Sequence, residues 1–211
     1  MLKFFYSTGT CSTVTHIALE EAALPYTGVE VSWSRNVNVD ELAKVSPLGA
    51  VPAVVIDGKL LTQTPAILEY IAEAAPGKNL LAKPGSFERL ETLSWVAFAS
   101  ADFQKAYAPI FLARRLNLDD KAKTEIRKNS LEKIEKYVAH IDANLAGKDF
   151  IMGKLFTIAD AALFTFLGWT TWIEFDTAAY KNVTAYMKRI YERPAVQKVL
   201  KAEELLSFVK A

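Results

Sequence analysis

The stretch Val51-Pro-Ala-Val-Val-Ile-Asp-Gly-Lys-Leu-Leu-Thr-Gln-Thr-Pro-Ala-Ile67 combines two short apolar runs, a tight turn and the start of a helix. The Asp57-Gly58 pair between the runs suits a two-residue type I′ turn, so the runs are predicted to form a β-hairpin. Thr64 is a residue type that caps helices and Pro65 suits the first helical position, so a helix is expected to follow directly.

The residues before this stretch alternate between strand and helix patterns. Leu2–Tyr6 is a short apolar run rich in aromatics, Ile17–Leu24 has the spacing of an amphipathic helix, and Val29–Trp33 is a second candidate strand. Residues 1–80 therefore follow the order β-α-β and then ββ-α, which predicts an α/β domain.

A linker is predicted at residues 81–87. Pro84-Gly85 is a strong breaker pair, and Ser86 is placed to cap the helix that follows. The linker separates the α/β domain of residues 1–80 from a second domain of residues 88–211.

The second domain has helical patterns throughout. Glu88–Leu116 is a long helical stretch that Pro109 is expected to kink or divide. Thr157-x-x-Asp160 is a capping-box variant that precedes the run Ala161–Leu167, which is apolar on nearly all sides. That helix is therefore expected to be central and buried, within an all-α C-terminal domain.

Composition excludes several classes of protein. The chain has 211 residues with 25 basic and 24 acidic side chains, and 51% of its residues are hydrophobic, with a mean hydropathy of +0.11. This composition argues against disorder, and the balanced charge gives no footprint for nucleic acid or an anionic membrane surface. One Cys and two His argue against a disulfide framework and a metal site. We find neither a signal peptide nor an apolar stretch of 18 residues, so a cytoplasmic globular protein is expected.

Cys11 is the first candidate for chemistry because it lies between the first strand and the first helix. Ser12 or Thr13 is placed to cap that helix, and the helix N-terminus favours a thiolate there. The alternative is an inert thiol that packs as a small hydrophobe.

Three further positions have two interpretations each. Gln63-Thr64 lies at the start of a helix, where it is suited either to bind a carboxylate or to cap the helix. Val51-Pro52 precedes a strand, with either a trans or a cis bond. Tyr6 and Ser7, at the end of the first strand, are candidate donors to an anionic substrate, although Tyr6 also suits the core. His16 and His140 are interpreted as structural or surface residues rather than catalytic ones.

Four segments, in order along the chain, resemble the cytosolic glutathione transferases of the bacterial beta class. They are Tyr6-Ser-Thr-Gly-Thr-Cys-Ser12, Ser46-Pro-Leu-Gly-Ala-Val-Pro52, Leu61-Thr-Gln-Thr-Pro-Ala-Ile67 and Phe156-Thr-Ile-Ala-Asp160. The resemblance implies a thioredoxin-like N-terminal domain, an all-helical C-terminal domain and a homodimer. It also implies that glutathione is a co-substrate, and that neither a metal nor another cofactor takes part.

The resemblance implies roles for individual residues. Cys11 is expected beside the glutathione sulfur, and Val51, before a cis Pro52, is expected to pair its backbone with the cysteinyl unit. The γ-glutamyl group is expected at Gln63 and Thr64, and the glycyl end near Arg35.

The departures from the class also lie in the expected site. Gln104 stands where the class has a His that reaches the active site, and Ala50 and Gln63 replace a polar and an acidic residue. Gln104 forms hydrogen bonds but does not titrate near neutrality, so it is not expected to handle protons. Lys105 matches the pattern. The hydrophobic electrophile is expected against four aromatic side chains, Tyr107, Phe111, Trp169 and Trp172.

Three functions follow as hypotheses. The first is conjugation of the glutathione thiolate to hydrophobic electrophiles in detoxification. The second is glutathione-dependent thiol–disulfide exchange or dehalogenation through Cys11. The third is a non-catalytic binding or regulatory protein, because a fold does not imply a function.

Overall fold

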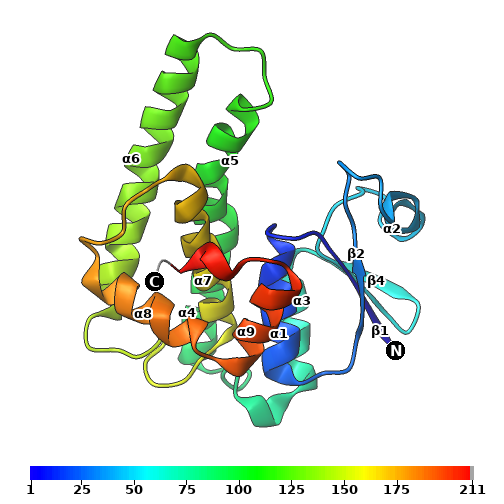
Figure 1. Ribbon diagram of the computed structural model, residues 1–211. Coiled ribbons are helices and arrows are strands. Elements are labelled where there is room, and N and C mark those ends of the chain that lie inside the picture. Colours follow the sequence, from blue (N-terminus) through cyan, green and yellow to red (C-terminus); the bar gives the residue numbers. More distant parts are fainter. Residues whose placement is uncertain (210–211) are drawn as a thin grey trace.

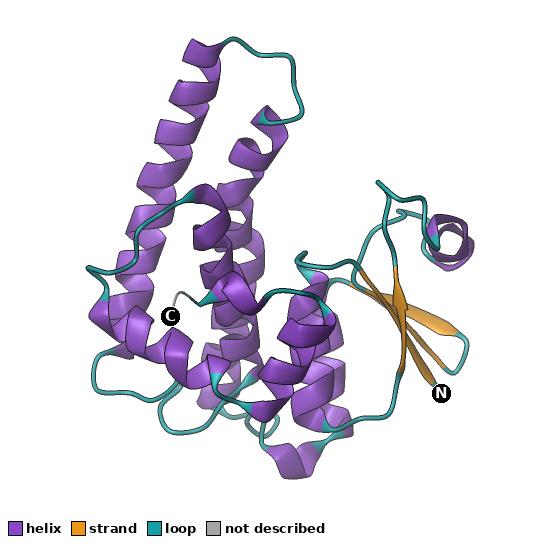
Figure 2. Ribbon diagram, viewed as in Figure 1, coloured by secondary structure: helices purple, strands orange, loops and turns teal. Residues whose placement is uncertain are grey.

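The computed structural model describes residues 1–209, and it consists of a small sheet-containing domain beside a larger bundle of helices (Figures 1 and 2). The N-terminal domain contains β1 (Leu2–Tyr6), α1 (Ser12–Ala22), β2 (Thr27–Glu30), α2 (Val39–Val45), β3 (Ala53–Ile56), β4 (Lys59–Thr62), α3 (Thr64–Ala74) and the 3-10 turn η1 (Pro76–Lys78). The C-terminal domain contains α4 (Phe87–Ala97), the π-helix η2 (Phe98–Phe103), α5 (Gln104–Ala113), α6 (Asp120–Leu145), α7 (Ile158–Gly168), η3 (Trp169–Ile173), α8 (Lys181–Tyr191), α9 (Pro194–Ala202) and η4 (Leu206–Phe208).

The four strands form one mixed sheet in the order β2-β1-β3-β4. β1 runs parallel to β2 and antiparallel to β3, and β3 and β4 form the predicted hairpin. Asp57 and Gly58 both have positive φ, at 48° and 83°, as a type I′ turn requires. The predicted β-α-β and ββ-α order is confirmed, with α2 as an element that the sequence patterns did not indicate.

Alternating side chains of β1 build the cores on the two faces of the sheet. Phe4 packs with the main core, which includes Ile17 of α1 and Ile67 of α3, whereas Phe5 packs with Leu42 of α2. This follows from the two-residue side-chain period of a strand. Figure 1 accordingly shows α1 and α3 on one side of the sheet and α2 on the other.

The long helical stretch predicted at Glu88–Leu116 is interrupted, but not where the sequence predicted. α5 continues as an α-helix through Pro109, and the interruption is the π-helix at Phe98–Phe103. A proline removes one backbone hydrogen bond, but the buried side chains of Tyr107 and Ile110 on either side hold this helix together. The π-helix places an extra residue in the turn directly before Gln104 and so sets the direction in which Gln104 projects.

The helix α7 is central, as predicted, and all of its residues are buried. Its capping box is complete: the Thr157 amide donates to Asp160 at 2.7 Å, and the Thr157 side chain caps the Asp160 amide. The predicted cap of α4 is also confirmed, because Ser86 Oγ accepts a hydrogen bond from the Arg89 amide. In the described part of the chain, no helix is both long enough and apolar enough to span a membrane.

The two domains share a continuous core. Helix α1 of the N-terminal domain packs against α7 and α9 of the C-terminal domain, as the neighbouring blue and red helices in Figure 1 show. Between Lys78 and Phe87 the chain has no helix or strand. The loop between β1 and α1 lies directly against the helical domain, because Gly9 in this loop bonds to Glu203 and Trp169.

Candidate active site

Cys11 lies at the N-terminus of α1 and faces a pocket between the two domains. Its backbone is already helical, at φ −59° and ψ −16°, and its thiol donates to the Val51 carbonyl oxygen at 3.4 Å. The pocket encloses about 220 Å³ and is lined by Cys11, Ser46, Leu48, Ala50, Val51, Pro52, Thr62, Gln63, Thr64, Pro65, Ser100, Gln104 and Lys105. The pocket thus brings together seven of the predicted site residues: Cys11, Val51, Pro52, Gln63, Thr64, Gln104 and Lys105.

The predicted caps of α1 are wrong, because neither Ser12 nor Thr13 caps the helix. Ser12 Oγ instead accepts from the Ser7 amide at 3.0 Å, and Thr13 Oγ1 donates to Glu203 Oε2 at 2.7 Å. The Ser12 hydroxyl therefore holds the loop before Cys11, whereas the Thr13 hydroxyl ties the start of α1 to Glu203.

Burial raises the pKa of the Cys11 thiol, opposite to the expected fall. The Gln104 side chain, the backbone amide of Cys11 and the Lys105 charge act in the other direction, and desolvation outweighs them. The sequence shows that Cys11 begins a helix, but not that the domains cover it. In this structure the neutral thiol is therefore favoured at neutral pH.

The peptide bond between Val51 and Pro52 is cis. Val51 precedes β3, and among residues 1–209 its amide N–H has no hydrogen-bond partner. One main-chain donor is therefore free beside the Cys11 sulfur.

Helix α3 begins at Thr64, one residue before the predicted start. Gln63 occupies the N-cap position with φ +70° and makes no side-chain cap, and Pro65 is the second helical residue. A positive φ is costly for a residue with a side chain, and such strain clusters at binding sites. The start of α3, with buried Thr64 and exposed Gln63, opens into the Cys11 pocket.

The structure does not bring Tyr6, Ser7 or Arg35 to this pocket. The Tyr6 ring stacks against Phe4 and contacts His16, and burial and the charge on Glu30 raise the pKa of its phenol. The Ser7 carbonyl accepts hydrogen bonds within its own loop.

Arg35 is exposed and forms an ion pair with Glu30. Its expected contact with the glycyl end therefore remains a prediction that requires this ion pair to open.

The four predicted aromatic residues occupy different environments. Phe111 and Trp169 line a second pocket of about 280 Å³, together with Gln104, Lys105, Ala108, Leu112 and Arg115. Tyr107 is completely buried and Trp172 packs against Gly9, so neither lines this pocket. The helical period alone does not distinguish the buried face of α5 from its pocket face.

Glu203 lies outside both pockets but supports the Cys11 loop, and sequence reasoning missed it. Its fully buried carboxylate accepts from the Gly9 amide at 3.0 Å and contacts His16 Nδ1 at 2.7 Å, and Trp169 Nε1 donates to the Gly9 carbonyl at 3.0 Å. The C-terminal domain therefore holds the Cys11 loop through both the amide and the carbonyl group of Gly9. No local signal marks Glu203, because its partners lie almost the whole chain away.

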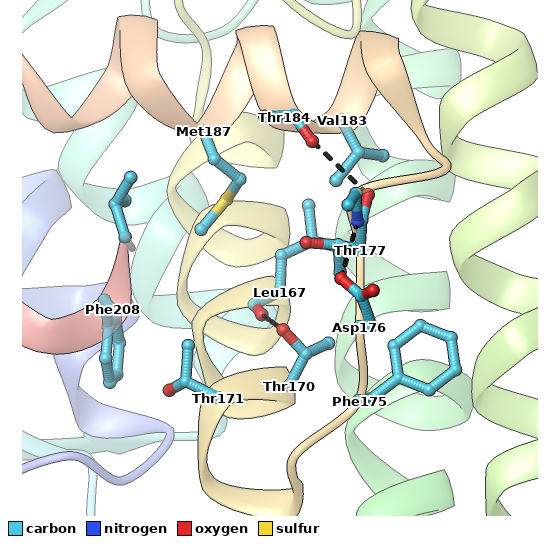
Figure 3. Close-up of a pocket in the computed structure, with 12 residues that line it drawn as sticks. Leu167, Thr170, Thr171, Phe175, Asp176, Thr177, Val183, Thr184, Met187 and Phe208 are labelled. Carbon is cyan, nitrogen blue, oxygen red and sulfur yellow. Dashed lines mark hydrogen bonds between the residues drawn. The ribbon is translucent and has the colours of Figure 1, made fainter. Parts of the chain in front are cut away.

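A further pocket, shown in Figure 3, lies between α7, α8 and the C-terminal segment. None of the predicted site residues lines it. The Thr170 and Thr184 hydroxyls donate to the backbone carbonyls of Leu167 and Thr177, so these polar groups are already satisfied. Among residues 1–209 there is also no cluster of side chains suited to a metal ion.

Comparison with known proteins identifies the family. Residues 2–73 match the model of the glutathione S-transferase N-terminal domain, and residues 95–194 match that of the C-terminal domain. The chain is 35% identical to glutathione S-transferase GstA of Escherichia coli O157:H7, with 97% of this chain and all of the relative covered. It is 31% identical to glutathione S-transferase GST-4.5 of Xanthomonas campestris, with the same coverage.

Solved structures agree with these matches. A sphingomonad glutathione S-transferase complexed with glutathione is 38% identical, with a TM-score of 0.86 over 96% of this chain and 99% of that one. The beta-class glutathione S-transferase of Sphingomonas chungbukensis is 36% identical, with the same TM-score and coverage. The mixed sheet with its helices, the helical second domain and both matched domain models lead to one conclusion: this chain belongs to the glutathione S-transferase family.

Proposed function

We propose that this transferase conjugates the thiol of glutathione to hydrophobic electrophiles. The observation that carries the proposal is the convergence of Cys11, the Val51 backbone, Gln63 and Thr64 in one pocket, beside a second pocket with an aromatic wall. The relatives named as glutathione S-transferases, one of them complexed with glutathione, support the same assignment.

The polar groups of the Cys11 pocket suit an extended peptide with charged ends. The unpartnered Val51 amide pairs with the cysteinyl unit in the manner of an added strand. The N-terminus of α3, with Gln63 and Thr64, receives the γ-glutamyl carboxylate, because the unpaired amides there attract anions.

The raised pKa of Cys11 favours conjugation over covalent catalysis by this residue. A protonated thiol donates a hydrogen bond to the glutathione thiolate, whereas attack by Cys11 itself requires its own thiolate. Gln104 adds a second hydrogen-bonding group but no titratable one, so the proton of the glutathione thiol leaves to solvent.

The test is the conjugation of 1-chloro-2,4-dinitrobenzene, together with the affinity for glutathione measured by calorimetry. We expect Thr64→Val to raise the KM for glutathione by about fivefold, the loss of one hydrogen bond. Thr27→Val, on the exposed strand β2, is the matched control and should leave it unchanged. Absence of both conjugation and glutathione binding in the native protein would refute the proposal.

The second candidate is glutathione-dependent thiol–disulfide exchange or reductive dehalogenation, and the position of the Cys11 sulfur in the pocket favours it. Cys11→Ala separates the two activities. Exchange requires this sulfur and disappears without it, whereas conjugation survives at a reduced rate. A binding or regulatory protein, the third hypothesis, would bind glutathione and show no turnover.

We further propose a homodimer in a bacterial cytoplasm with a role in detoxification. Phe87 and Leu90, one turn apart on α4, are 72% and 61% exposed, which suits a contact with a second copy. The bacterial sources of both curated relatives and the single free thiol support the rest. Light scattering should give twice the mass of one chain, and Leu90→Lys should shift the equilibrium towards monomer.

A further inference from the structure

The second pocket, which adjoins the Cys11 pocket, combines an aromatic wall with basic side chains. Phe111, Leu112 and Trp169 provide its apolar surface, and Lys105 and Arg115 are its charged residues. Gln104 and Lys105 line both this pocket and the Cys11 pocket, so the two are neighbours. A molecule on the aromatic wall is thus placed next to the site proposed for the glutathione sulfur.

No carboxylate of residues 1–209 neutralises the charge on Arg115 in an ion pair. Among residues 1–209, the guanidinium of Arg115 and the ammonium of Lys105 lie in no ion pair. The neighbouring Arg114, by contrast, donates to the Trp172 carbonyl at 2.9 Å and lies 5.7 Å from the Phe111 ring centroid.

None of the described residues that line either pocket carries a carboxylate. The basic groups therefore give this end of the pocket a positive potential, and the low-dielectric aromatic wall next to them focuses it.

The order of residues along α5 gives the pocket a direction. Gln104 and Lys105 begin the helix next to Cys11, Phe111 follows two turns later, and Arg115 lies just beyond the helix end. A bound molecule therefore has its reacting carbon near Gln104, its ring against Phe111 and Trp169, and its far end towards Arg115.

We propose that this pocket selects aromatic electrophiles that carry an anionic group, such as a carboxylate or a sulfonate, and that Arg115 recognises that anion. The inference rests on the proposed conjugation and adds its substrate class. In the reaction the glutathione sulfur, having released its proton to solvent, forms a bond to the ring carbon that bears a halide. The carbon–halogen bond breaks and the halide leaves with its electron pair.

The test compares 4-chloro-3-nitrobenzoate with its methyl ester, which differ in one negative charge. We expect Arg115→Gln to lower kcat/KM for the acid about fivefold, the upper range for one solvent-exposed ion pair, and to change that for the ester less than about twofold. Arg115→Glu should lower kcat/KM further, and for the acid alone. Lys136→Gln, an exposed position on α6 outside both pockets, removes the same charge and should leave the ratio of acid to ester unchanged.

Equilibrium binding separates a failure of this inference from a failure of the proposed function. The unreactive pair 4-nitrobenzoate and methyl 4-nitrobenzoate is titrated by calorimetry into the native protein and into Arg115→Gln. Weaker binding of the acid alone in the variant supports the inference even if no conjugation is found. Equal effects of Arg115→Gln on acid and ester, in both binding and turnover, would overturn it while leaving conjugation intact.

Discussion

Glu203→Ala is the substitution whose effect follows most directly from the structure. The carboxylate is fully buried and contacts three groups of the first domain: the Gly9 amide at 3.0 Å, Thr13 Oγ1 at 2.7 Å and His16 Nδ1 at 2.7 Å. Alanine removes all three contacts at once and leaves buried polar groups without partners.

The expected cost is large for a single side chain. Each buried group left unsatisfied costs about 1–3 kcal/mol, and breaking a buried charged contact by removing one partner costs about 3–5 kcal/mol. We therefore expect the free energy of unfolding to fall by about 3–5 kcal/mol for Glu203→Ala. Glu203→Gln keeps an accepting oxygen on one side only, so we expect it to cost about 1–2 kcal/mol.

Urea denaturation measures both values, from midpoints at an unchanged slope. Hydrogen exchange of the Gly9 amide gives an independent readout, since this amide loses its acceptor in the alanine variant. The matched control is Glu204→Ala, which removes the same charge from the adjacent exposed position and should change stability by less than about 0.5 kcal/mol. If Glu203→Ala costs no more than this control, or leaves Gly9 exchange unchanged, the reasoning is wrong.

Three further predictions concern burial and packing. Asp160→Ala should lower the free energy of unfolding, measured by urea denaturation, by about 3–5 kcal/mol. The reason is that it leaves the buried Tyr186 hydroxyl, 2.9 Å from Asp160 Oδ1, and other donors unpaired. A cost below that of Tyr186→Phe would contradict this. Alkylation of Cys11 by iodoacetamide should rise with pH through a midpoint above that of an ordinary thiol, because burial raises its pKa. The folded state holds this proton more tightly than the unfolded chain. The free energy of unfolding should therefore also fall as the pH rises past the pKa of the unfolded thiol. An alkylation midpoint below that pKa would refute both expectations. Gly168→Ala should cost about 1–3 kcal/mol by thermal unfolding, because the added Cβ would lie 2.3 Å from the Phe208 ring; an unchanged melting temperature would count against this close packing.

The sequence alone determined the local elements of this fold. Asp57-Gly58 predicted the hairpin turn, Ser86 the start of α4, and Thr157 with Asp160 the capping box of α7, and all three are present. Each depends on dihedral preferences or on hydrogen bonds between residues at most three positions apart. The resemblance to the family likewise depended on short segments in a fixed order.

Only the tertiary structure decided the electrostatic state of the site and which side chains enter it. Cys11 lies at the start of a helix, as the sequence indicated, but the packing around its thiol buries it, and this desolvation raises its pKa. Tyr107 and Phe111 lie one turn apart on the same helix, yet one is core and the other lines a pocket.

Glu203 gives the clearest case, because its partner Gly9 lies 194 positions away in the chain. Desolvation depends on everything packed around a group, and contacts between distant segments exist only once the domains have come together. Propensity and spacing carry no information about either, so they indicated where the elements lie, whereas packing decided what the side chains between them can do.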